Sequence, residues 1–184
     1  MDPKIVVAIG VAIVVILALV WIVARKRRTE TLQRRFGPEY DRALREHGPG
    51  KAESVLAQRE KRVEKLPIRE LPVDERERFV TAWRTVQSRF VDDPRGAVAD
   101  ADDLVSRVMQ ARGYPVTDFE QRAADISVDH PRVVANYRAA HEIALRHRRG
   151  QASTEDLRNA IIYYRSLFDE LLQSPTVGER REVA

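Results

Sequence analysis

The sequence opens with an unbroken run of 20 residues without charge, positions 5–24. At a rise of about 1.5 Å per residue, a helix over this run spans about 30 Å, the thickness of a bilayer hydrocarbon core. A buried core helix of this length would normally carry a polar face, and none is present. A cleaved signal peptide would have its basic residues before the run, and Ile22-Val23-Ala24 is a poor cleavage site. The pattern therefore predicts a single transmembrane helix.

Basic residues gather directly after this run. Residues 25–44 carry seven of them, whereas residues 1–4 carry only Lys4. The excess of Lys and Arg predicts that the N-terminus lies outside and the C-terminal domain in the cytoplasm, as in a single-pass protein of a bacterial inner (plasma) membrane. We interpret the basic cluster as a topology signal or a contact with anionic lipid; it consists of Arg25, Lys26, Arg27 and Arg28.

Beyond the basic cluster, apolar positions recur with helical spacing and are interrupted by Gly and Pro. Gly37-Pro38 begins a short helix that Gly48-Pro49-Gly50 ends, and a second helix over about 51–65 completes a helical hairpin. The two prolines of 67–72 indicate an extended linker. The predicted organisation is an N-terminal tail (1–4), a transmembrane helix (5–24), a basic juxtamembrane segment (25–36), a membrane-proximal helical hairpin (37–66), a linker (67–72), a helical bundle (73–173) and a disordered tail (174–184).

Four longer amphipathic helices make up the predicted bundle. The first places large apolar side chains at steps of four, three and four residues: Phe79, Trp83, Val86 and Phe90. The starts of the other three carry N-cap signals, namely Asp93 before Pro94, Asp129 before His130-Pro131, and Ser153. Between them, the Thr117/Glu120 capping box predicts a short turn of helix over residues 118–125. Because no segment alternates apolar and polar residues between turns, we expect an all-α fold with an antiparallel four-helix-bundle-like domain.

Composition narrows the possible functions. The 184 residues include no Cys, which excludes disulfides, thiolate metal sites and a cysteine nucleophile. Of 32 basic and 28 acidic residues, five and one lie in residues 1–28, which leaves 27 of each sign in 29–184. Because the basicity is confined to one end, we expect no nucleic-acid partner.

The sequence contains few residues in patterns typical of metal binding or catalysis. His141-Glu142 begins like the zinc-protease motif, but Leu145 stands where the second histidine would be. We therefore expect no metal and no other cofactor. One stretch carries more polar groups at core positions than a plain bundle needs, namely Tyr114, Asp125, Asp129, His130, Tyr137 and His141.

Two interpretations of this stretch remain open. An aspartate could orient a histidine there, which would make residues 114–141 the site of a small-ligand-binding protein or a hydrolytic enzyme. The simpler interpretation is a helix cap with hydrogen-bonded groups at the core edge, because no nucleophile or metal set accompanies them. We expect no catalysis, and interpret the chain as a protein-interaction or scaffold module. Its expected partners are the lipid bilayer and an unidentified protein or a second copy.

The stretches 34–44, 89–94, 112–141 and 157–172 resemble a group of uncharacterised bacterial proteins. In that group an N-terminal transmembrane helix precedes a soluble helical region. The resemblance covers about residues 30–173 and implies a bacterial inner-membrane location. It implies no activity, ligand or catalytic residue.

Overall fold

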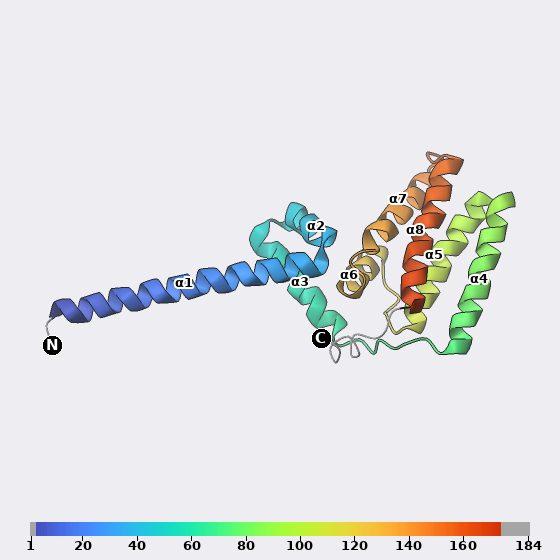
Figure 1. The fold of residues 1–184 in the computed structure, drawn as a ribbon. Coiled ribbons are helices and arrows are strands. Elements are labelled where there is room, and N and C mark those ends of the chain that lie inside the picture. The colour runs from blue at the N-terminus through green and yellow to red at the C-terminus, as the bar shows by residue number, and fades with distance from the viewer. Residues whose placement is uncertain (1–2, 174–184) are drawn as a thin grey trace.

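The structure, a computed structural model, describes residues 3–173, with side chains from residue 16 on. The described part consists of eight helices and contains no strand. These helices are α1 (Pro3–Phe36), α2 (Pro38–His47), α3 (Pro49–Val63), α4 (Val73–Asp92), α5 (Pro94–Ala111), α6 (Phe119–Asp129), α7 (Val134–Arg148) and α8 (Thr154–Gln173). Figure 1 shows α1 extending away from the other helices as one long rod.

The first three helices follow directly from their Gly-Pro junctions. Gly37 (φ 49°) and Gly48 (φ 75°) adopt backbone conformations that other residues rarely take, and a proline in the first turn opens each following helix. Leu32 and Phe36, at the end of α1, contribute to a small core with α2 and α3. Val128 of α6 completes this core, so α6 connects the N-terminal helices to the bundle.

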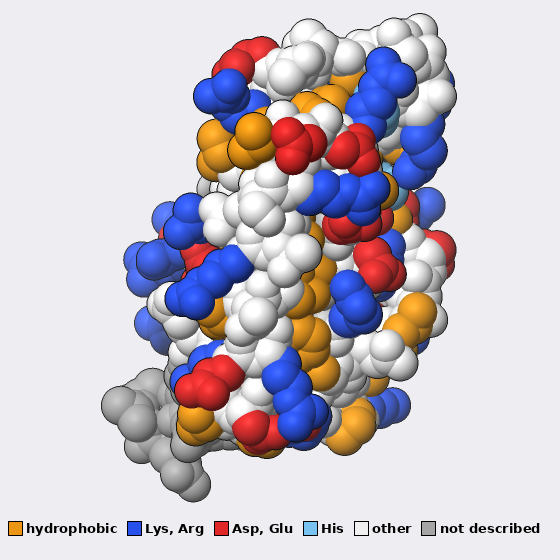
Figure 2. Space-filling view, turned by 90° about the vertical axis from the view of Figure 1, so that its right-hand side faces the viewer, with side chains coloured by type: hydrophobic (Ala, Val, Ile, Leu, Met, Phe, Trp, Pro, Cys, Tyr) orange, Lys and Arg blue, Asp and Glu red, His pale blue; other side chains and the backbone are white. Residues whose placement is uncertain are grey.

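The bundle places α5 and α8 at its centre, with α4 packed against α5 and α7 against α8 (Figure 1). Trp83 of α4 stacks on Phe168 of α8 with ring centroids 4.7 Å apart, and both side chains are buried. Figure 2 shows basic and acidic side chains interspersed on one face of the molecule, with hydrophobic side chains between them. The fold of the described residues is therefore all-helical, with a bundle at the C-terminal end.

The prediction of a membrane-spanning helix is wrong: among the described residues, no helix combines the length and the apolar character needed to cross a membrane. Side chains 5–15 of the apolar run lie outside the described ones. The predicted single-pass inner-membrane location and its orientation depended on this helix, and they are therefore wrong as well.

Two predicted helix starts are also corrected. Asp118, and not Thr117, caps α6, because its carboxylate accepts a hydrogen bond from the Gln121 backbone N–H at 3.0 Å. Asp129 is the last residue of α6 and does not open α7, which begins at Val134. Apolar positions inside 119–129 bury that segment, so the helix continues to Asp129, beyond the short helical segment 118–125 that the sequence predicts. The predicted tail 174–184 and residues 1–2 lie outside the described residues.

Candidate functional site

A groove of about 580 Å³ lies where α2, α6 and α7 meet. Three of its lining residues lie at the start of α6, five lie on α7, and α2 contributes a single arginine. The lining residues are Arg42, Asp118, Phe119, Glu120, Arg138, Ala139, His141, Glu142 and Leu145.

A stacked aromatic pair forms one side of the groove. The rings of Phe119 and His141 lie 3.6 Å apart at an angle of 7°, and Tyr137, one turn earlier on α7, contacts Phe119 with centroids 4.9 Å apart. The Asp118 cap places Phe119 as the first residue of α6, facing α7. Burial lowers the pKa of His141 below its usual value of 6.5, so the ring is neutral at pH 7.

A buried ion network lies beneath the groove. The carboxylate of Glu39, which is 2% exposed, accepts hydrogen bonds from Arg138 at 3.0 and 3.3 Å and from Arg59 at 3.2 Å. Arg138 also donates to Glu120 at 2.6 Å, and Arg59 donates to Ser127 at 3.4 Å. The network joins α2, α3, α6 and α7, and each of the three guanidinium nitrogens of Arg138 donates a hydrogen bond to a carboxylate in it.

The remaining charges of the groove are not balanced in the same way. Arg42 contacts Glu46 at 2.9 Å and Glu120 at 3.7 Å. Asp118 and Glu142, both exposed, form no ion pair with any residue that the structure describes. The rim therefore offers carboxylates to a ligand, whereas its arginines already have partners.

The six residues of the predicted polar cluster occupy three separate places. Tyr137 and His141 lie together beside the groove. Tyr114 donates to Asp129 at 2.7 Å, and His130 directly follows Asp129 in the sequence. Asp125 lies apart from both groups.

Tyr114, Asp125, Asp129 and His130 each interact with other side chains of the fold. The Nδ1 atom of His130 lies 3.2 Å from the Glu170 carboxylate, and burial lowers the pKa of His130. Asp125, fully buried, accepts hydrogen bonds from Arg62 at 2.9 Å and from Gln121 at 2.7 Å. The structure thus brings together pairs of the predicted residues but no common cleft of Asp125, His130 and His141.

A second polar group in the bundle interior was missed by the sequence analysis. Arg122 donates to Ser106 at 2.5 Å, and Asp102 lies near the hydroxyl of Tyr164. Burial raises the pKa values of Tyr137 and Tyr164, which keeps both phenols neutral. The available signal was that Asp102 and Ser106 are one turn apart and share a helix face.

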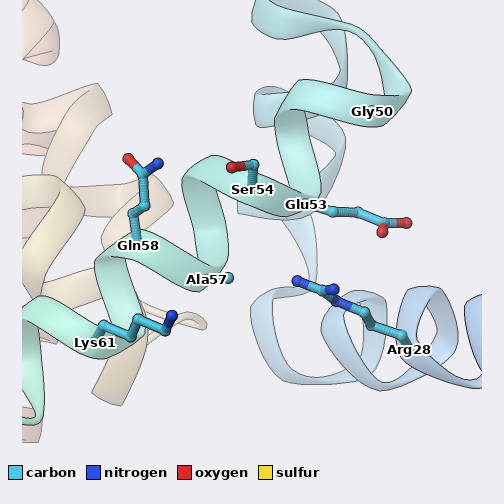
Figure 3. A pocket seen from close by; sticks show the side chains of 7 residues that line it. All are labelled: Arg28, Gly50, Glu53, Ser54, Ala57, Gln58 and Lys61. Carbon is cyan, nitrogen blue, oxygen red and sulfur yellow. The ribbon is translucent and has the colours of Figure 1, made fainter.

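The basic cluster lies on the described part of α1. The guanidinium of Arg25 lies 5.4 Å from the centroid of Trp21. Figure 3 shows Arg28 reaching from α1 toward α3, where it lines a hollow of about 360 Å³ that Glu53 and Lys61 also line. The interpretation of the basic cluster as a topology signal depended on the membrane-spanning helix and is withdrawn together with it. Contact of the cluster with anionic lipid stays a prediction.

Metal binding has no support in the described part of the chain, where no three His, Asp or Glu side chains are grouped so that they could hold an ion. Comparison of the chain with protein-family models, curated proteins and solved structures gives no match. The resemblance to a bacterial group stays a prediction, and a functional proposal rests on the geometry described above.

Proposed function

We propose that the chain is a protein-interaction module whose helix α1 docks into an apolar site of a partner protein. The observation that carries this proposal is the exposed apolar surface of α1. Seven large apolar side chains are each between 49% and 62% exposed, namely Ile16, Leu17, Leu19, Val20, Trp21, Ile22 and Val23. Contiguous exposed apolar surface on this scale marks an interaction site.

The distribution of these residues indicates the shape of the partner site. Successive residues of a helix are rotated by about 100°, so the consecutive side chains of 16–23 cover every side of α1. A single flat surface or one partner helix would leave part of this circumference in water. The partner site is therefore a deep groove or a bundle that encloses the helix.

The bundle behind α1 supports the same proposal. The residues predicted for catalysis are divided among three places, and His130 and Asp125 are buried with structural partners. The ion network of Glu39 fixes the N-terminal helices on α6 and α7. A docking helix on a firmly attached base presents its surface in a defined orientation, which lowers the entropy lost on binding.

Site-directed photo-crosslinking tests the proposal. A benzoylphenylalanine replaces Leu19 in the full chain, and the matched control carries the same group at the exposed position Ser88 of α4. We expect a discrete protein adduct from position 19 in cells that make the protein, and none from position 88. An adduct of twice the chain mass would identify a second copy as the partner. Absence of any protein adduct from position 19 would contradict the proposal.

A further inference from the structure

We propose that the groove between α2, α6 and α7 binds an arginine side chain presented by a partner protein. This second docking site is independent of α1, about 580 Å³ in volume, and open to solvent. Two features select the ligand: carboxylates without ion-pair partners at the rim, and a stacked aromatic pair in the wall.

The charges favour a cation. In and around the groove, six carboxylates (Glu39, Glu46, Asp102, Asp118, Glu120 and Glu142) accompany five guanidinium groups (Arg42, Arg59, Arg122, Arg138 and Arg148). The excess is one negative charge, and it is located at the rim, where Asp118 and Glu142 have no ion pair within the described residues. An anionic ligand would meet these carboxylates while Arg42 and Arg138 are held by their own partners.

The wall favours a planar cation over a point charge. The face of Phe119 is covered by His141, and the neutral imidazole adds a second flat surface at the groove. A guanidinium group stacks on aromatic faces and donates to two carboxylates at once, because its five N–H groups lie in one plane. An ammonium group is a compact, strongly hydrated point charge without this planar fork of donors, so it is held less well by the same surface. Leu145 and Ala139 provide apolar surface for the aliphatic stem of the arginine.

Peptide binding to the full chain provides the test. The probe is a fluorescein-labelled peptide of four Ser-Arg repeats, and anisotropy reports its affinity. Peptides with Lys or Glu in place of Arg measure selectivity. We expect the order Arg above Lys, with no binding of the Glu peptide.

Isosteric variants assign the site. Asp118→Asn, which retains a helix-capping side chain, and Glu142→Gln each weaken the Arg peptide by about fivefold, the upper range for an exposed ion pair. Matched controls are Asp103→Asn and Glu155→Gln, whose side chains are 67% and 70% exposed on α5 and α8. The controls leave the affinity unchanged.

A third variant separates stacking from charge. Phe119→Leu keeps both carboxylates and removes the ring against which the His141 imidazole is stacked, so we expect the preference for Arg over Lys to disappear while Lys binding stays the same. Equal weakening by the control variants, or an unchanged Arg preference in Phe119→Leu, would overturn the proposal. Leu19→Ser in α1 leaves peptide affinity unchanged, so failure at the groove and failure of the proposed α1 docking are distinguishable.

Discussion

The ion network of Glu39 makes the sharpest prediction about stability. Glu39 is 2% exposed, and the side chains of its partners Arg59 and Arg138 are 13% and 10% exposed. Glu39→Gln keeps the shape of the side chain and removes its charge. Three charge-assisted hydrogen bonds are lost or weakened, and two largely buried guanidinium groups lose their shared carboxylate.

The expected cost follows from which partners remain. Removing one member of a buried ion pair costs about 3–5 kcal/mol, since the other charge stays buried without compensation. Arg138 retains Glu120, which is itself exposed, and Arg59 retains only a hydroxyl at 3.4 Å. We therefore expect the lower end, about 3 kcal/mol, in the free energy of unfolding. A cost of this size is a large part of the total stability of a domain.

Urea denaturation of the full chain, followed by circular dichroism at 222 nm, measures this cost. The matched control is Glu155→Gln, because Glu155 forms only an exposed i,i+3 pair with Arg158; we expect a change within about 0.5 kcal/mol. A double-mutant cycle with Arg138→Met isolates the pair term. A Glu39→Gln variant within 0.5 kcal/mol of the parent protein would refute the reasoning, since the network would then add nothing.

Three further predictions concern the bundle. Trp83→Ala should lower the unfolding free energy by about 3–5 kcal/mol, the usual range for truncating a buried aromatic, and an unchanged urea midpoint would contradict its place in the core. Gly113→Ala should destabilise the chain, because φ is 98° there and an added Cβ would collide with the Pro67 carbonyl; thermal melting measures the effect, and an unchanged melting temperature would contradict the loop geometry. Burial lowers the pKa values of His130 and His141, so the unfolded chain takes up protons first and stability should fall as pH drops from 7 to 5. A variant with Gln at both positions should show a flatter profile in urea midpoints measured across that range.

Much of the local structure is determined by the sequence alone. The helix breaks at Gly37 and Gly48 combine a glycine with positive φ and a following proline. Both residue types can be recognised directly in the sequence. Asp93 caps α5 through a hydrogen bond from the Gly96 N–H at 2.9 Å, as the Asp-Pro pair indicates. Trp83 faces the core because it belongs to a stripe of helical period, and the period is a property of the sequence.

Long-range geometry decided the rest. Glu39 and Arg138 are 99 residues apart, and nothing in either neighbourhood indicates that they meet. The same holds for Phe119 and His141, whose stacking requires the start of α6 to lie against α7. Helical periodicity assigns a residue to a face of its own helix, but it does not say which other helix covers that face.

The candidate site shows the same division. Tyr137 and His141 stand out in the sequence because polar groups at core positions are unusual, and both lie at or behind the groove. Asp125 and His130 are close to them in the sequence but not in space. Asp125 and His130 are separated from Tyr137 and His141 because the side chains leave their helices in different directions. Which partner each direction reaches is decided only by the packing of the helices. Tertiary packing therefore decided the site, whereas the sequence determined the elements from which it is built.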